Sequence, residues 1–272
     1  MTAPVAPISQ PGIYHDLPAA DYHADPIEGG SLSSTGARKL LPPGCPAKFR
    51  YWADHPQPPK REFDLGHAAH RTLLGVGEEI VVIDAATWKT KAAREARDEA
   101  YDAGQVPLLP HELTKVEEMI EAVRNHPVAS AVFANGKPEV TLAWFNDMFG
   151  VWQRARLDWL PDGPITIPDP GTGKLRPYLV IPDYKTCVSA EPDALAKAMH
   201  THGYHQQIDW YSGILTHLGL TDVPLLPLLV AQEKEPPYVV TVAQPDASAM
   251  RVAATRNRKA LDVYSICMQS GI

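Results

Sequence analysis

The chain has 272 residues, of which 44% are hydrophobic and 21% are charged. This length and composition allow one large domain with a buried core, and they exclude a largely disordered chain. The formal net charge of −7 argues against a protein that coats nucleic acid non-specifically, although an acidic chain can still carry a local basic cleft.

The chain contains three widely spaced cysteines, Cys45, Cys187 and Cys267. This pattern is typical of a reducing compartment, and we expect a cytoplasmic protein without disulfides. It excludes a CxxC zinc site and a four-cysteine iron–sulfur cluster. The first residues lack a basic region followed by an apolar run, and no stretch reaches the roughly 18–20 apolar residues of a membrane span, so we expect no signal peptide and no membrane contact.

The first half of the chain is predicted to be mainly helical. Residues 1–30 are rich in proline, glycine and small residues and are predicted to form an extended arm, with residues 31–272 as a single domain. Residues 31–35 offer helix N-caps, so a helix is predicted to begin there. The prolines in 42–46 are predicted to end it. Hydrophobic spacing then predicts helices over 47–55, 63–74, 88–103, 112–125 and 126–134, with a strand over 79–83.

After residue 138 the apolar residues alternate, which indicates strands. Segments 139–145 and 151–159 are predicted to form a β-hairpin around 147–150. A proline- and glycine-rich loop over 161–177 leads to a third strand over 178–185. The remaining elements are predicted to be a helical region over 192–218, strands over 225–232 and 238–243, and a helix over 247–268. This order predicts one α/β or α+β domain.

Two predicted strands carry side chains suited to metal and phosphate chemistry. Asp183 and Lys185 lie at positions i and i+2, so they project from the same face. The carboxylate can bind a divalent cation while the ammonium stabilises a phosphate transition state, although the pair alone could be a surface ion pair. Arg154, Arg156 and Asp158 share one face of the preceding strand, opposite an apolar face that includes Ala155, Leu157 and Trp159.

Two helical motifs are weaker. In the GHAAH segment, Gly66 and His70 lie one turn apart, so the glycine permits close approach beside the imidazole. Gln207 and Tyr211 share one face of a later helix, and their amide and hydroxyl groups can form hydrogen bonds. Taken separately, His70 could be structural, and the second helix could simply pack its aromatic residues.

The order of these motifs resembles the RecB-like branch of the PD-(D/E)xK nucleases, and most closely the RecE-type exodeoxyribonuclease VIII domain of phage recombination modules. The chain presents GxxxH, Glu139, RxD, DYKT and QxxxY in succession, and its opening SLSST segment also fits. The likeness spans roughly residues 20–215. It implies a PD-(D/E)xK restriction-endonuclease-like core, with a central mixed β-sheet flanked by helices and helical N-terminal decoration.

The resemblance also implies a role for each matched residue. Carried over by position, the metal ligands are His70, Asp158, Asp183 and the backbone carbonyl of Tyr184. Lys185 is the catalytic lysine, and the further catalytic residues are Glu139, Gln207 and Tyr211. The residues expected to contact DNA are Arg154, Arg156, Ser31 and Ser33. One or two Mg²⁺ or Mn²⁺ ions would activate a water molecule, and no iron–sulfur cluster is expected.

The family's activity implies that the substrate is the end of linear double-stranded DNA. Digestion from 5′ to 3′ would leave 3′ single strands for a RecT-type annealing partner, and a homo-oligomeric ring is a further expectation. A CRISPR-adaptation-like nuclease without its cluster and a catalytically silent DNA-binding protein remain alternatives. A different class, a histidine-based metal enzyme, would use His67, His70, His200, His202 and His205.

Overall fold

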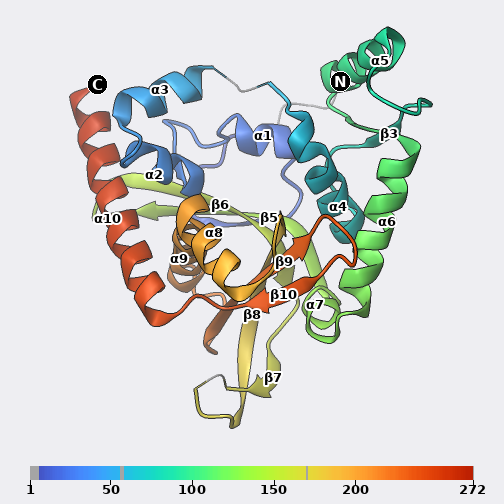
Figure 1. The fold of residues 1–272 in the computed structure, drawn as a ribbon. Helices are drawn as coiled ribbons and strands as arrows, with labels where there is room; N and C mark the ends of the chain where they lie inside the picture. The colour runs from blue at the N-terminus through green and yellow to red at the C-terminus, as the bar shows by residue number, and fades with distance from the viewer. Residues whose placement is uncertain (1–5, 56–57, 170, 272) are drawn as a thin grey trace.

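The computed structural model describes residues 6–55, 58–169 and 171–271. Its described strands form two four-stranded sheets and one two-stranded sheet. Helices lie on both sides of the strands, and the β7–β8 hairpin projects from the body of the molecule (Figure 1). The mixed α/β class predicted from the sequence is therefore confirmed.

The first sheet has the order β1-β5-β6-β2. Its strands are β1 (Gly12–Tyr14), β5 (Gly136–Asn146), β6 (Val151–Pro161) and β2 (Leu32–Ser33). β5 and β6 form the predicted antiparallel hairpin, β1 pairs antiparallel with β5, and β2 pairs parallel with β6. The sheet is therefore mixed, as expected.

The second sheet has the order β10-β9-β8-β7. Its strands are β10 (Val240–Ala243), β9 (Leu225–Glu233), β8 (Leu175–Cys187) and β7 (Ile165–Pro168). β8 runs parallel to β9 and antiparallel to β7. The prediction of a loop over residues 161–177 was wrong, because part of this segment pairs as the β7–β8 hairpin. Local composition did not reveal a strand whose partner lies in the next segment.

The third sheet is small and pairs β3 (Ile80–Val82) with β4 (Val106–Leu108) in parallel. β4 was not predicted, since it is short and contains Pro107. The helical elements of the described chain are α1 (Ala19–His23), α2 (Ser34–Leu40), α3 (Pro46–Asp54), η1 (Arg61–Phe63), α4 (Asp64–Leu74), α5 (Lys91–Asp102), α6 (Pro110–Asn125), α7 (Pro127–Val132), α8 (Pro192–His202), α9 (Tyr204–His217) and α10 (Ala247–Ser270).

The helical region predicted over residues 192–218 is two helices. They meet at Gly203, whose φ of 69° is left-handed and ends α8. Glycine adopts this conformation at little steric cost, so it is the usual helix C-cap. The break sets the direction of α9, which carries two of the predicted site residues.

Residues 1–30 were expected to form an extended arm. Residues 1–5 lie outside the described residues, and the structure corrects the expectation for residues 6–30. The segment contains β1 and α1, and it buries the side chains of Ile8, Leu17, Tyr22 and Ile27 against Ala143 of β5. The amino-terminal segment is therefore packed onto the sheet, close to the arginines of β6.

Two apolar cores lie on opposite sides of the strands that carry the site. One core packs α2, α9 and α10 against β5, β6 and β8, with Trp210 and Leu157 buried at its centre. The other packs α4, α6 and α7 against β8 and β9, around Met119 and Val230. Among the described helices, none combines the length and the hydropathy that crossing a bilayer requires.

Candidate active site

Asp158 is a buried carboxylate on β6 that faces Glu139 on β5. The hairpin places the two residues opposite each other, because the neighbouring positions on both sides pair across the strands. Asp158 is only 9% exposed. Glu139 has a φ of 53°, an uncommon left-handed conformation for a residue other than glycine. Backbone strain of this kind is found where a surrounding structure holds a side chain for function.

Asp183 and Lys185 project together from β8 toward Asp158. The Lys185 Nζ atom lies 2.7 Å from Asp183 Oδ2 and 3.7 Å from Asp158 Oδ2. One ammonium group therefore links a carboxylate of the first sheet with a carboxylate of the second. The structure brings together the three residues that the sequence placed at the chemical centre.

His70 approaches the carboxylates from α4. Its Nε2 atom lies 3.4 Å from Asp158 Oδ1, and its Nδ1 atom lies 3.5 Å from Glu139 Oε1. Gly66 makes this approach possible, because a Cβ atom there would lie 3.0 Å from Thr186 Oγ1 on β8. His70, Glu139 and Asp158 offer ligand atoms that all lie within 4.8 Å of one another. Such a nitrogen and oxygen set can hold a divalent metal ion.

Helix α9 supplies the polar residues behind Asp183. Gln207 Nε2 donates a hydrogen bond of 2.9 Å to Asp183 Oδ1 and lies 3.0 Å from the Tyr211 hydroxyl. Tyr211 is buried, and burial raises its pKa well above the usual value. Gln207 therefore orients the Asp183 carboxylate, and Tyr211 completes the hydrogen-bonded group.

Tyr184 contacts the site through its backbone. Its amide N–H donates a hydrogen bond of 2.7 Å to Asp158 Oδ2. In a strand, the N–H and C=O groups of one residue point to the same edge, so the Tyr184 carbonyl also faces β6. Its side chain is turned away, and the phenol donates to Gln232 Oε1 at 2.5 Å. The backbone of Tyr184 is thus oriented toward the carboxylates.

The two central carboxyl groups differ in acidity. Burial raises the pKa of Asp183 to about 6, against the opposing charge of Lys185. Burial would also raise the pKa of Asp158, but the charges of Lys185 and His70 outweigh it and hold that pKa well below its usual range.

The two basic groups of the site, Lys185 and His70, both have raised pKa values. Burial lowers the pKa of Lys185, but Asp158 and Asp183 outweigh it, so the pKa lies above its usual value. The pKa of His70 is likewise raised by Asp158 and Glu139 against the effect of burial. At neutral pH the site therefore contains ionised carboxylates beside the positively charged, partly exposed ammonium group of Lys185.

Arg154 and Arg156 are engaged inside the protein. Arg154 Nη1 lies 2.8 Å from Asp25 Oδ2, and Arg156 forms an ion pair with Glu139. Both guanidinium groups lie over the ring of Tyr22, at 5.5 and 5.6 Å from its centroid. Their side chains are only 12% and 13% exposed. The structure therefore places the two arginines in a paired internal network, in place of the open phosphate-binding row that the strand pattern predicted.

The two serines expected to contact DNA also have internal partners. Ser31 is buried and accepts a hydrogen bond of 2.7 Å from Arg154, while its own hydroxyl donates to Asp25. Ser33 caps α2 by accepting a hydrogen bond from the Gly36 amide. Both hydroxyls thus act in folding the segment around α2.

Arg38 is a site residue that the sequence analysis missed. It lies on α2 and donates to the His202 carbonyl and to Thr35 Oγ1, which are both uncharged acceptors. Burial lowers the pKa of Arg38, and nearby Tyr211, Tyr204 and Asp183 oppose that effect. The available signal was a charged residue on a short helix whose other positions are largely buried. Arg38 lies far from the other motifs in the sequence, so its position near the active site was not predicted.

The structure does not gather the histidines of the alternative metal enzyme. Among the described residues, the one group of three metal-ligating side chains contains His70 and no other histidine. His67 lies near Glu78, His200 stacks on His205, and His205 contacts the Met199 carbonyl. The three cysteines are free.

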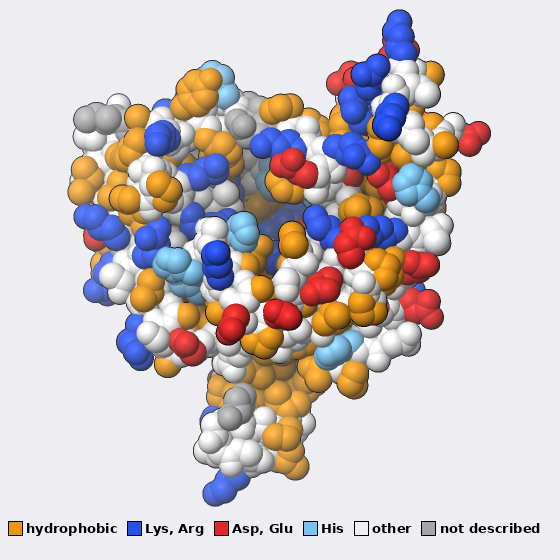
Figure 2. Space-filling model, in the orientation of Figure 1, with side chains coloured by type: hydrophobic (Ala, Val, Ile, Leu, Met, Phe, Trp, Pro, Cys, Tyr) orange, Lys and Arg blue, Asp and Glu red, His pale blue; other side chains and the backbone are white. Residues whose placement is uncertain are grey.

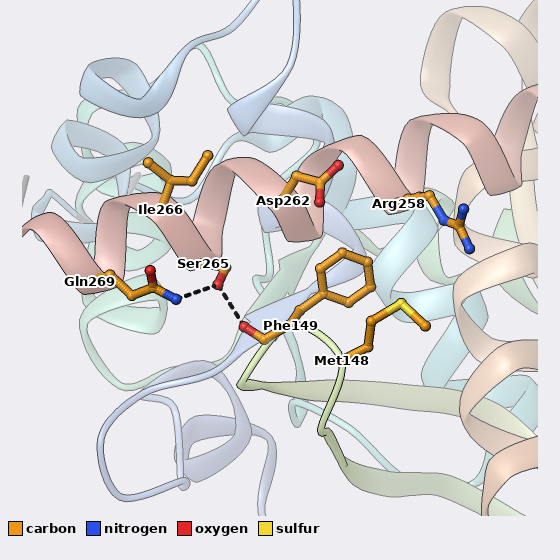
Figure 3. Close-up of a pocket in the computed structure, with 7 residues that line it drawn as sticks. All are labelled: Met148, Phe149, Arg258, Asp262, Ser265, Ile266 and Gln269. Carbon is orange, nitrogen blue, oxygen red and sulfur yellow. Dashed lines mark hydrogen bonds between the residues drawn. The ribbon is translucent and has the colours of Figure 1, made fainter.

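The surface around the site is hollowed. Figure 2 shows a hollow near the middle of one face, with Lys and Arg side chains on both sides, in the region that α1, α2, α4 and α8 surround in Figure 1. A separate hollow of about 480 Å³ lies between the β5–β6 turn and α10 (Figure 3). There Ser265 donates a hydrogen bond of 2.6 Å to the Phe149 carbonyl, and none of the candidate site residues lines it.

Comparisons with known proteins bear on the fold. No family model and no curated protein sequence matches the chain. The structure is similar to the crystal structure of a protein from Eubacterium rectale that is described as a candidate exonuclease, with a TM-score of 0.64 and 12% sequence identity. The match covers 94% of this chain and 87% of that chain. At this identity the likeness concerns the fold, and it agrees with the nuclease-like α/β architecture expected from the sequence.

Proposed function

We propose that the protein is a metal-dependent deoxyribonuclease of the PD-(D/E)xK type. One observation carries the proposal: Lys185 links the buried carboxylates Asp158 and Asp183, while His70 and Glu139 offer ligand atoms that lie within 4.8 Å of one another and of Asp158. Buried carboxylates beside a lysine are costly to fold, and they cluster where a site binds cations and stabilises developing charge.

The residues present fit a divalent cation. Asp183 Oδ2 is buried and accepts no well-directed hydrogen bond, although it lies near the Lys185 ammonium. Oxygen ligands from Asp158, Asp183 and Glu139, with one imidazole nitrogen, suit Mg²⁺ or Mn²⁺ better than a softer metal. Such an ion supplies an activated water and neutralises charge on the phosphate. The set can hold one or two ions.

The chain's own groups have distinct tasks in this proposal. Lys185 holds a positive charge beside both carboxylates, where it stabilises the negative charge that develops on a phosphate. Gln207 fixes the orientation of Asp183, and Tyr211 supports Gln207 from the next turn of α9. The Tyr184 amide holds Asp158 in place. The two carboxylates are thus held in place by groups on β8 and α9.

Arg38 is better placed than Arg154 and Arg156 to contact a phosphate of the substrate. Its two hydrogen-bond acceptors are neutral, and it forms no ion pair within the part of the chain that the structure describes. Arg154 and Arg156 are instead paired with Asp25 and Glu139. A guanidinium near the site can form charge-assisted hydrogen bonds with a phosphodiester.

The finer activity follows from the family resemblance. We infer an exonuclease that digests linear double-stranded DNA from 5′ to 3′ and leaves a 3′ strand for a RecT-type annealing protein. A ring-shaped homo-oligomer and a cytoplasmic location belong to the same inference. The name of the Eubacterium rectale protein supports an exonuclease in general, and it does not bear on polarity or partners.

The test is digestion of end-labelled linear DNA and closed circular DNA in Mg²⁺ or EDTA. We expect loss of the linear form only in Mg²⁺, with the 5′ label released first. Lys185→Ala should abolish cleavage and retain duplex binding, whereas Lys174→Ala on the exposed β7–β8 loop should cleave like the wild type. Cleavage that survives EDTA or Lys185→Ala would overturn the proposal. Duplex binding without cleavage by the wild type would favour the silent DNA-binding alternative.

A further inference from the structure

A second pocket lies at the amino-terminal end of α4, the helix that carries His70. It has a volume of about 400 Å³, within the usual range of small-molecule sites. We call it the α4 pocket. Its lining includes Lys60, Phe63, Asp64, His67, Tyr101 and Gln105. These residues come from η1, α4, α5 and the start of β4, which lie together in the upper right of Figure 1.

One wall of the α4 pocket is aromatic and exposed. Phe63 is 51% exposed, although burial is the usual state of a phenylalanine ring. The His67 ring stacks near it, with a centroid distance of 6.3 Å and an interplanar angle of 28°. An open aromatic face of this kind offers a flat ligand a stacking surface.

The pocket also contains a buried hydrogen-bond acceptor. Asp64 is only 5% exposed, and its Oδ2 atom accepts a hydrogen bond of 2.7 Å from the Tyr101 hydroxyl. Among the described residues, no hydrogen bond is made to its other carboxylate oxygen, which keeps some exposure to the pocket. A carboxylate oxygen is a strong acceptor, so a ligand N–H donor would be favoured there.

Helix α4 connects the pocket with the active site, because it carries both Asp64 and His70. Phe63 and His70 are seven residues apart, so they lie about two helical turns, or ~10 Å, apart on the same side of α4. Stacked nucleotides in one strand are spaced by ~3.4 Å, so this separation corresponds to about three nucleotides. A strand whose phosphate lies at the carboxylates can therefore place a nearby base at Phe63.

We propose that the α4 pocket binds one unpaired nucleobase of the DNA strand held at the active site, an inference that rests on the proposed function. Phe63 stacks on the base, and Asp64 accepts a hydrogen bond from its amino group. Cytosine, adenine and guanine carry an exocyclic amino donor, whereas thymine carries two carbonyl acceptors and only a ring N–H donor. The pocket therefore prefers a base with an amino group, such as cytosine, to thymine, and Lys60 can contact the backbone phosphate.

The experiment measures binding of fluorescently labelled (dC)12 and (dT)12 by anisotropy in EDTA. The wild type should bind (dC)12 more tightly than (dT)12. Phe63→Ala should weaken (dC)12 binding about tenfold, which is the lower part of the range for loss of one base stack. Phe63→Tyr should retain wild-type affinity, and so should Met148→Ala, which changes an exposed apolar side chain in the separate hollow of Figure 3.

Asp64→Asn gives the sharper readout, because the amide keeps an acceptor for the Tyr101 hydroxyl and adds a donor. We expect this variant to reduce or reverse the preference for (dC)12 over (dT)12. Equal binding of the two oligonucleotides by the wild type, or an unchanged affinity of a folded Phe63→Ala variant, would overturn the proposal. If the base-dependent binding is found but Mg²⁺ produces no cleavage, the pocket stands and the nuclease function fails.

Discussion

Lys185→Met tests whether the ammonium group is the counter-charge that allows two carboxylates to be buried together. The substitution keeps a long side chain and removes the charge beside Asp158 and Asp183. Removing one partner of a buried ion pair costs about 3–5 kcal/mol. The Lys185 side chain is 23% exposed, so we expect the lower value, about 3 kcal/mol, for the metal-free protein at pH 8.

The loss of stability should depend on pH. Burial already raises the pKa of Asp183 to about 6, and removal of the ammonium raises it further. A carboxyl group whose folded pKa exceeds its unfolded pKa destabilises the protein increasingly as pH rises through the folded value. The difference between Lys185→Met and the wild type should therefore be smaller at pH 5 than at pH 8.

Urea unfolding in EDTA at both pH values measures these effects, with Lys174→Met as the control. Mn²⁺ at about 100 times its dissociation constant should return about 2.7 kcal/mol to the variant, because the ion takes the position of the missing charge. A Lys185→Met protein as stable as the wild type at pH 8 in EDTA would show that the ammonium group is not the counter-charge of Asp158 and Asp183.

Three further predictions follow from the same geometry. Below a pH of about 6, Mn²⁺ affinity measured by calorimetry should fall toward a limit of about tenfold per pH unit, because Asp183 must lose one proton to bind the ion. A flat profile would contradict the role of Asp183 as a ligand. Gly66→Ala should lower activity by pushing α4 and His70 away from β8, and Thr186→Ala should restore part of it, since Thr186 Oγ1 lies 3.0 Å from the added Cβ atom. Without such rescue, close packing at Gly66 is not what positions the imidazole. Arg38→Ala should weaken duplex binding about tenfold and reduce the salt dependence of log Kd by about 0.9, which is the loss of one phosphate contact, and an unchanged slope would remove Arg38 from the interface.

The sequence by itself determined the features that depend on local periodicity. Alternation along two segments identified the strands that carry Asp158, Asp183 and Lys185, because neighbouring side chains of a strand must point to opposite faces. Helical spacing likewise placed His70 one turn from Gly66. These inferences hold because each involves residues a few positions apart.

Alternation failed at one point on β6. Trp159 was expected on the same apolar face as Ala155 and Leu157, but it packs in the second core beside Phe133. Leu160 returns to the first core, so the alternation of β6 is inverted after Asp158. A sequence pattern gives the period of a strand, and it does not show which layer each end contacts.

Only the tertiary structure decided which charges are available to a ligand. Arg154 and Arg156 lie on the predicted face, yet Asp25 and Glu139 neutralise them, and Asp25 belongs to a segment expected to be an extended arm. Arg38 joins the site from a distant helix. Ion pairing depends on distances between segments far apart in the chain, and those distances are set by how the two cores pack the sheets together.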